Sequence, residues 1–442
     1  MQRRFRGYGL IAMPPVMTPR TDRCALWSWA FYDWANSSFA ALVQTFVFAA
    51  YFARAVAENE TVGTAQWGSM MGITGVCIAL GGPLLGAVAD RSGRRKPWLG
   101  LFTGMCILAT AALWSIEPSP EFVWPALVLA GVGTLGSEYA MIFYNAMLPD
   151  LAEPKAIGRW SGWGWGLGYA GGLVLLLIAL YGFVEVGAWF AVSREKAMHV
   201  RAVMPLTACW YLIFCLPLFL WTPDAPPSSA GSALPLGQSV KQGIAQVRLS
   251  LKEVRKYRDI GIFLLARLFY NDGLTTMFAF GGIYAAGTFG MTPSQIILFG
   301  VGLNVTAGLG AAGFAWMDDR LGPRRTIQIS LLCLTGCAAV ILSVRSVSLF
   351  WGFGLVMGFF VGPVQASSRS YLAHVAPAEI RGEMFGLFAL SGKVTSFLGP
   401  LLVGWLTVAS GSQRGGMSAI LVLLGVGLVG MFLVPPVREN KE

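Results

Sequence analysis

The strongest constraint on this chain is a series of long apolar runs, each bounded by charged or turn-forming residues. A helix needs about 20 residues to cross a hydrocarbon core of about 30 Å, so runs of this size predict membrane-spanning helices. Twelve such runs are present, at 27–53, 67–89, 97–116, 122–147, 160–182, 202–221, 260–287, 294–317, 326–344, 348–372, 383–408 and 417–434. We therefore expect an all-α membrane protein with twelve transmembrane helices.

Composition supports this class and excludes others. Charged residues make up 12% of the 442 residues, whereas soluble domains carry roughly 25%. With 28 Phe and 16 Trp, the chain has more apolar side chains than one or two water-soluble cores could bury. The seven cysteines fall within or beside apolar runs, which indicates core residues and neither disulfides nor a metal site.

The basic residues are distributed unevenly between the two sides of the predicted membrane. Most Lys and Arg lie at the two chain ends and in the loops on the same side as those ends. Because positively charged loops stay in the cytoplasm, both termini are expected to be cytoplasmic, in a multi-pass protein of the bacterial inner membrane. The net charge of +10 is scattered over short loops, which favours membrane lipids over nucleic acid as partners.

The longest polar connection divides six apolar runs from six. Its first part is rich in Pro and Ser, and its second part is basic with interleaved apolar positions. That pattern is typical of an amphipathic helix on the membrane surface, and a solvated linker is the open alternative. We expect a cytoplasmic extension at 1–26, a six-helix bundle at 27–221, the linker at 222–259, a second six-helix bundle at 260–434 and a cytoplasmic tail at 435–442.

The two halves of the chain resemble each other. Segments 31–38, 86–95 and 144–154 have counterparts, in the same order, at 269–276, 315–325 and 367–377. The offsets are about half the chain length, which indicates two pseudo-symmetric bundles with a binding site between them.

The loop after the second run carries a recognisable motif. Gly86-x-x-x-Asp90-Arg91-x-Gly93-Arg94-Arg95 resembles the signature loop of the major facilitator superfamily. The segments at 32–37, 144–150, 164–172, 267–273 and 365–370 are similar to its "unknown major facilitator" branch, which includes the vacuolar amino-acid effluxers of fungal autophagy. This resemblance implies the major facilitator fold and secondary transport by alternating access, with amino acids as the best-known cargo of the fungal members.

In that superfamily, the signature loop latches the two halves together on the cytoplasmic face. The resemblance implies a gating motif made of Gly86, Asp90, Arg91, Gly93, Arg94, Arg95, Asp319 and Arg320. Gly86 permits close helix packing, and Asp90 can pair with a helix N-terminus or an arginine. The same arginines also satisfy the orientation rule, so a role in topology alone stays open.

Six charged residues lie within the predicted spans, namely Asp33, Glu138, Asp272, Arg267, Arg369 and Lys393. Each costs at least about 2.5–3.5 kcal/mol near a helix centre unless it is paired or wetted. Their charges sum to zero, so mutual pairing alone can account for them. The functional alternative is that pairs exchange partners as the bundles move, which lets a carboxylate take up a proton when its cation leaves.

Under the functional alternative, the charges divide into two roles. Asp33 and Glu138 are the candidates for a proton or counter-ion site, and Arg267 and Lys393 are the candidates for holding a substrate carboxylate. The rest of the candidate substrate or coupling-ion site consists of Asn36, Tyr144, Asn145, Asn271, Asp272, Gln365 and Arg369.

The sequence thus predicts a secondary transporter for a small polar solute, an amino acid or a related zwitterion or anion, with proton coupling. No nucleophile with a base, metal-ligand cluster or phosphate-binding motif is present, so we expect no enzyme activity, metal or cofactor. We expect a monomer that binds a small-molecule substrate and membrane lipids and no nucleic acid. The alternatives are a lipid or drug exporter of the same fold and a non-transporting receptor.

Overall fold

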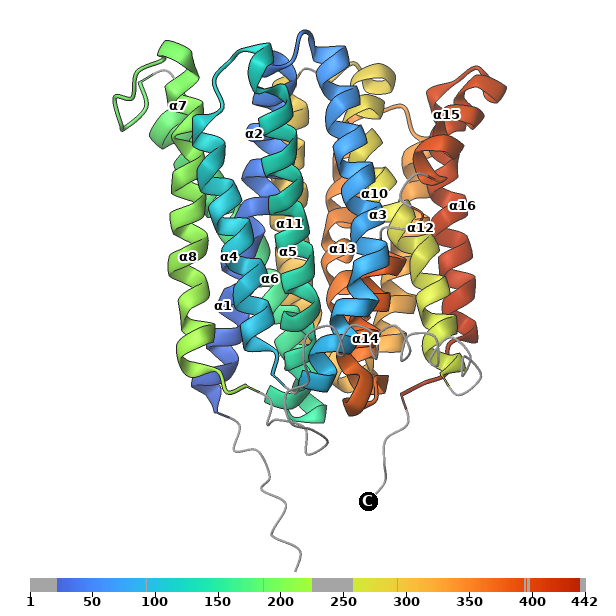
Figure 1. Cartoon of the computed structure of the whole chain (residues 1–442). Coiled ribbons are helices and arrows are strands. Elements are labelled where there is room, and N and C mark those ends of the chain that lie inside the picture. Colours follow the sequence, from blue (N-terminus) through green and yellow to red (C-terminus); the bar gives the residue numbers. More distant parts are fainter. Residues whose placement is uncertain are drawn as a thin grey trace, which may run out of the picture.

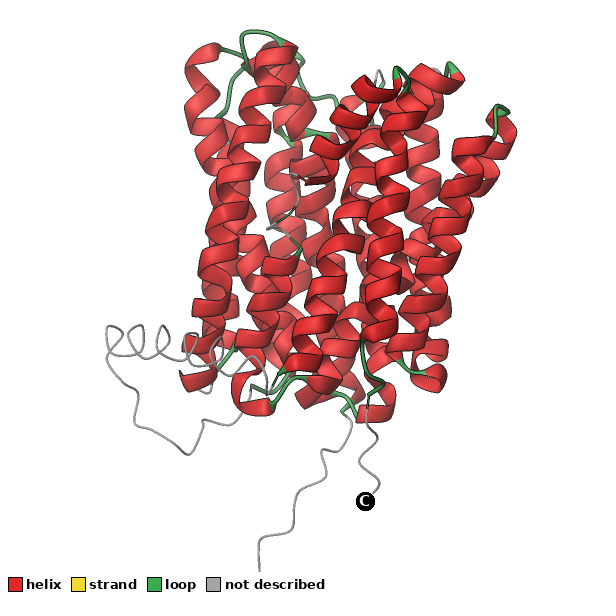
Figure 2. Cartoon of the chain, turned by 90° about the vertical axis from the view of Figure 1, so that its right-hand side faces the viewer, coloured by secondary structure: helices red, strands yellow, loops and turns green. Residues whose placement is uncertain are grey.

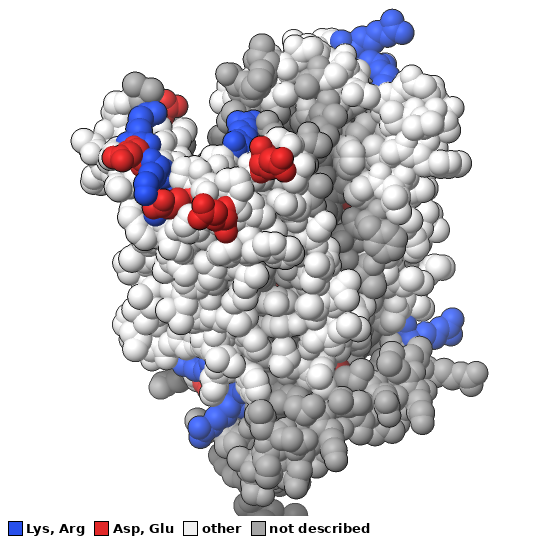
Figure 3. All heavy atoms as spheres, turned by 45° about the horizontal axis from the view of Figure 1, so that its top comes forward, with Lys and Arg blue, Asp and Glu red and all other residues white. Residues whose placement is uncertain are grey.

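Helices form at all twelve expected spans, and turns and short connections make up the remainder of the described chain (Figures 1 and 2). The computed structural model describes residues 22–92, 94–185, 187–224, 257–291, 293–392, 395 and 398–437. Within this part, ten helices or helix chains are long and apolar enough to cross a membrane. Figure 3 shows charged side chains toward the ends of the visible face and a broad uncharged band between them. The chain is a multi-pass membrane protein, as its apolar runs predict.

The first bundle begins with a span built from four consecutive helices. These are α1 (Arg23–Phe39), η1 (Ala40–Phe46), α2 (Phe48–Tyr51) and η2 (Phe52–Val56), of which η1 and η2 are π-helical. The longer helices that follow are α3 (Glu60–Ser92), α4 (Lys96–Ala112), α5 (Val123–Leu151), α6 (Ile157–Ala179) and α8 (Val203–Trp221). Short helices extend or precede them, namely η3 (Leu113–Ser115), η4 (Pro120–Phe122), η5 (Pro154–Ala156), η6 (Leu180–Val184), η7 (Glu195–Ala197) and α7 (Met198–Arg201). Because π-helical turns are uncommon and are frequent at functional sites, η1 indicates that this span contributes to the site.

The second bundle contains an interrupted span. Its helices are α10 (Arg258–Phe289), α11 (Pro293–Leu321), α12 (Pro323–Ser343), α13 (Val347–Val375), η8 (Ala378–Ile380), α14 (Arg381–Ser391), α15 (Leu398–Ser410) and α16 (Gln413–Leu433). The span expected at 383–408 is divided, because α14 ends at Ser391 and α15 begins at Leu398. Lys393 and most of the 222–259 connection lie outside the described residues.

The bundles dock through helix pairs that the internal repeat relates. α3 packs along α14, and α6 packs along α11. Glycines allow this close approach, since a Cβ atom at Gly86 would overlap the backbone of Gly382 and one at Gly162 would overlap the backbone of Ala311. Two six-helix bundles in this arrangement confirm the expected fold class.

We call the end of the molecule where α1 begins and α16 ends the terminal end; it is the lower end in Figure 1. Eight side-chain hydrogen bonds between described residues join the two bundles in the half toward this end. The bundles are therefore latched together at the terminal end.

Candidate functional site

A buried ion pair joins the two bundles. Arg369 in α13 places Nη1 2.9 Å from Oδ2 of Asp33 in α1, and the two side chains are 1% and 8% exposed. The hydroxyl of Tyr144 in α5 donates a hydrogen bond to the same carboxylate oxygen at 2.9 Å. The opposite charges compensate each other at a depth where an unpaired charge would be costly.

Arg369 is inserted into a polar and aromatic socket of the first bundle. Its Nε donates to Ser161 Oγ at 2.8 Å, its Nη2 donates to the Ser161 carbonyl oxygen at 2.6 Å, and its Nη1 also donates to Asn145 Oδ1 at 3.3 Å. The guanidinium carbon lies 5.0 Å from the ring centroid of Trp29, and that ring stacks on Tyr144 with centroids 4.5 Å apart. This environment suits a planar, weakly hydrated cation and would suit lysine less well.

Glycines in α6 make room for the carboxylate of α1. A Cβ atom at Gly164 would lie 2.6 Å from Asp33 Oδ2 and 2.9 Å from Arg369 Nη2. A Cβ atom at Gly168 would lie 2.6 Å from Ser37 Oγ. The spacing of four places both glycines on one face of α6, so α1 can lie directly against that face.

A second polar cluster surrounds the interruption between α14 and α15. Arg267 in α10 donates from Nη1 to the carbonyl oxygen of Phe388 and to Ser391 Oγ, both at 2.8 Å, at the carboxyl end of α14. Asp272, also in α10, accepts a hydrogen bond at 3.0 Å from the backbone N–H of Gly399 in the first turn of α15. A cation at the carboxyl end of one half-helix and an anion at the amino end of the other both match the helix dipoles.

Asn271 connects this cluster to α13. Its Nδ2 donates to the carbonyl oxygen of Gly392 at 3.2 Å, and its Oδ1 accepts from Gln365 Nε2 at 3.3 Å. Glu138, in α5 of the first bundle, is near enough to Arg267 for an electrostatic interaction. This cluster, like the Asp33 cluster, therefore draws charges from both bundles.

A chamber of about 320 Å³ lies between the bundles, next to the Asp33–Arg369 pair. We call it the inter-bundle chamber; α1, η1 and α6 line one side, and α10 and α11 line the other. Ser37 lines it one helical turn beyond Asp33, and Trp165 lines it with its ring centroid 5.9 Å from the Arg369 guanidinium carbon. The ion pair itself does not line the chamber; it lies next to it, behind Ser37 and Trp165.

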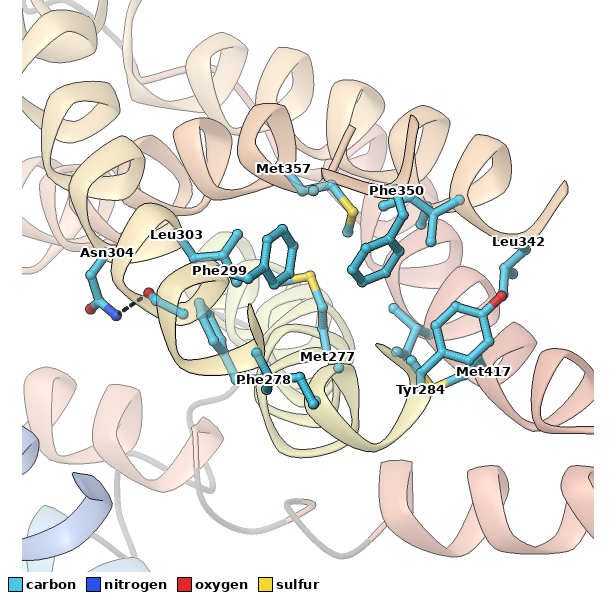
Figure 4. A pocket seen from close by; sticks show the side chains of 18 of the residues that line it. Met277, Phe278, Tyr284, Phe299, Leu303, Asn304, Leu342, Phe350, Met357 and Met417 are labelled. Atoms are coloured by element: carbon cyan, nitrogen blue, oxygen red, sulfur yellow. Dashed lines mark hydrogen bonds between the residues drawn. The ribbon is translucent and has the colours of Figure 1, made fainter. Parts of the chain in front are cut away.

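A second chamber, of about 310 Å³, is lined mainly by helices of the second bundle (Figure 4). We call it the apolar chamber, because side chains such as Met277, Phe299, Phe350, Met357 and Met417 line it. It shares Thr45, Phe46, Phe278 and Asn304 with the inter-bundle chamber, so the two adjoin. Methionines and aromatic rings provide an adaptable apolar lining.

The structure separates one expected site residue from the others. Asn36 faces the interior of the first bundle, where its Oδ1 accepts hydrogen bonds from Tyr211 at 2.7 Å and from Ser137 at 2.8 Å. Two residues that hold Arg369, Trp29 and Ser161, were not among the expected site residues. Trp29 lies four positions before Asp33 on the same helix face, a spacing that could have pointed to it.

Carboxylates also latch the bundles at the terminal end. Asp150, near the end of α5, forms ion pairs with Arg95 of its own bundle and with Arg381 at the start of α14. Asp319 in α11 accepts a hydrogen bond at 2.9 Å from the backbone N–H of Arg159 in the first turn of α6. Both contacts join opposite bundles near a helix N-terminus, where a carboxylate is favourable.

Some residues of the expected gating motif lie at this latch. Gly86 packs against Gly382, while Arg94 and Arg320 are exposed. The side chains of Asp90 and Arg91 and the whole of Gly93 lie outside the described residues.

Comparison with known proteins identifies the family to which the chain belongs. Residues 69–442 match the family model described as "Vacuole effluxer Atg22 like". The MFS-type transporter YxiO of Bacillus subtilis (strain 168) is 27% identical over 419 residues, which covers 92% of this chain and 94% of the relative. Autophagy-related protein 22 of Yarrowia lipolytica (strain CLIB 122 / E 150) is 26% identical over 317 residues, or 64% of this chain and 51% of the fungal protein. The match thus spans about half the length of the fungal relative.

A solved structure shares the fold. The proton:xylose symporter XylE, of the major facilitator superfamily, superimposes with a TM-score of 0.72 at 14% identity and covers 94% of this chain and 96% of that one. Because the family model matches most of the sequence, this protein belongs to the Atg22-like vacuole effluxer family of MFS-type transporters.

Proposed function

We propose that this protein carries a small zwitterionic or anionic solute, such as an amino acid, across the membrane by alternating access coupled to protons. The observation that carries the proposal is the buried Asp33–Arg369 pair, which joins the bundles next to the inter-bundle chamber. A charged solute needs charged partners in a water-excluding site, and this chamber lies directly beside two of them.

The conformation fits one step of such a cycle. The latch contacts hold the terminal end closed, and the inter-bundle chamber lies on the other side of the ion pair. With both termini in the cytoplasm, as the basic loops predict, this state is closed to the cytoplasm. Opening that side requires Arg369 to leave its socket.

The ion pair offers a way to couple that step to a proton. When Arg369 moves away, Asp33 loses the cation that compensates its charge, and a bound proton would take over that compensation. Glu138 interacts electrostatically with Arg267, so these two residues are a second carboxylate and cation contributed by opposite bundles. We propose Asp33 and Glu138 as the groups that carry the proton, and Arg267, Lys393 and the released Arg369 as ligands for a substrate carboxylate.

The test is uptake into proteoliposomes under an imposed pH gradient. A thermal-shift screen against amino acids, dipeptides and organic acids first selects a ligand, because a ligand that binds the folded state raises its melting temperature. We expect gradient-driven accumulation of that ligand by the wild type and by Asp259→Asn, which alters an exposed carboxylate in α10. Asp33→Asn is expected to abolish it. Equal accumulation by Asp33→Asn would contradict the proposal.

The apolar chamber favours a second candidate, a lipid or drug exporter. Its lining of methionines and aromatic rings would accept the apolar part of an amphipathic molecule. The same proteoliposomes distinguish the two candidates: export of a lipophilic fluorescent dye without uptake of any charged solute would favour the exporter. Saturable binding without any flux would instead identify a receptor.

A further inference from the structure

A third cavity, of about 450 Å³, lies at the terminal end, apart from the two chambers described above. It sits where α1 and α6 begin, and its lining includes Arg23, Trp27, Glu153, Arg159, Trp160 and Trp163. We call it the tryptophan cleft. None of these residues belongs to the candidate transport site.

Three indole rings fix the shape of the cleft. Trp27 and Trp163 stack with centroids 5.5 Å apart and planes 7° apart. Trp160 packs edge-on against both rings, at 5.2 Å and 5.1 Å. Tryptophan is enriched where a membrane protein meets the lipid headgroups, and the first turns of two spanning helices lie at that level.

The charged groups of the cleft match a phosphate. Arg23 is exposed in the first turn of α1, and the guanidinium carbon of Arg159 lies 5.7 Å from the Trp163 ring centroid. Both guanidiniums can bind phosphate oxygens with two donors. Glu153 and Asp319, whose Oδ2 lies 3.6 Å from Arg159 Nε, balance the two arginines, so a headgroup with a single phosphate charge fits the cleft better than a densely charged phosphate.

We propose that the tryptophan cleft binds the phosphodiester headgroup of a membrane phospholipid and that the bound lipid stabilises the conformation closed at the terminal end. Pockets between spanning helices that present arginines at the membrane surface are suited to lipid headgroups. A cleft at the end of a membrane bundle meets phospholipid at far higher local concentration than any soluble phosphodiester.

The link to conformation comes from two contacts that support the cleft from the other bundle. The backbone N–H of Arg159 donates to Asp319, and Trp163 packs edge-on against Trp316 of α11 with centroids 5.6 Å apart. When the bundles separate at this end, Arg159 and Trp163 lose this support. A ligand that binds one conformation more tightly shifts the population toward it.

Lipid binding is tested by native mass spectrometry of the full chain in uncharged detergent, titrated with phosphatidylglycerol. The variants are Arg23→Gln and the double variant Arg23→Gln/Arg159→Gln, with Arg325→Gln, an exposed arginine of α12, as the matched control. We expect the affinity for one tightly held lipid to fall about fivefold for each cleft arginine removed and to stay unchanged in the control. Equal affinity in the wild type and the double variant would overturn the site, and equally tight binding of soluble glycerophosphoglycerol would overturn the membrane as its source.

The conformational part needs a separate readout that does not depend on cargo. Lys155 and Glu379 are exposed at the terminal end, one in each bundle, so spin labels at these two positions report how far this end opens. The labels are introduced in a variant whose exposed Cys24, Cys77 and Cys209 are replaced by Ser. Phosphatidylglycerol should increase the short-distance population, and Arg23→Gln, which leaves the Asp319 contact intact, should remove that increase. No response to lipid would overturn the stabilising role, whether or not the protein transports an amino acid.

Discussion

Arg369 and Asp33 are 336 residues apart in the sequence, yet their side chains meet at 2.9 Å across the interface of the two bundles. Serine, asparagine and tyrosine side chains of the first bundle complete the hydrogen bonding around them. This pair connects the conformation of the molecule to the charge state of its membrane interior, because the bundles cannot separate at the terminal end while it stays intact.

Removing one member of the pair should open the terminal end. Asp33→Asn leaves Arg369 as an uncompensated buried charge, which costs the closed conformation about 3–5 kcal/mol. The label pair at positions 155 and 379 should then report longer distances. The double variant Asp33→Asn/Arg369→Gln should recover part of the closed population, and Asp259→Asn should behave as the wild type. An unchanged distance distribution in Asp33→Asn would show that the pair does not hold this end closed.

A methyl group at Gly164 should disturb the pair without altering any charge. The added Cβ atom would stand 2.6 Å from the Asp33 carboxylate, so Gly164→Ala should destabilise the closed conformation by about 1–3 kcal/mol and reduce transport. Gly313→Ala in α11 is the matched control, since a Cβ atom there has no neighbour within 4 Å. Thermal unfolding and uptake measured on both variants test this; equal behaviour of the two would contradict it.

Glu138→Gln should abolish pH-driven uptake and leave folding intact. The substitution keeps the size of the side chain but removes its ability to bind and release a proton. Uptake under a pH gradient and circular dichroism together measure the two effects. A coupling role for Glu138 is wrong if the variant still accumulates substrate against a gradient.

The latch at the terminal end should control the transport rate. Asp150→Asn removes the charge that joins Arg95 to Arg381, so the closed state should become less populated. Asp90→Asn, in the signature loop, should slow transport while membrane insertion stays normal. Turnover numbers normalised to inserted protein measure both effects, and an unchanged turnover in Asp90→Asn would support a role of that loop in topology alone.

Asp272 should stabilise the start of α15 through its charge as well as its hydrogen bond. Asp272→Asn keeps an oxygen that can accept from Gly399 but loses the interaction with the helix dipole, at a cost of about 0.3–2 kcal/mol. Asp272→Ala loses both and should lower the melting temperature further. Thermal unfolding of the purified variants ranks their melting temperatures. If Asp272→Ala and Asp272→Asn melt at the same temperature, the hydrogen bond does not contribute to stability.

Much of the fold was predictable from local patterns. Apolar runs of about 20 residues must become helices in a membrane, because no other arrangement satisfies their backbone hydrogen bonds within a single segment. The internal repeat predicted two bundles, and the fold confirms them. The interruption at the eleventh span was not predicted, because the residues there still form one apolar run and α10 provides the partners of both half-helix ends.

The sequence by itself determined that three carboxylates and three cations must be accommodated at membrane depth, since each is costly there when alone. It could not determine which carboxylate meets which cation. That choice depends on the rotation of each helix and on how the two bundles dock, so only the tertiary structure placed Arg369 beside Asp33 and Arg267 at the end of α14. For the same reason Asn36, only three residues from Asp33, faces the interior of its own bundle, because Tyr211 and Ser137 lie there to donate to it.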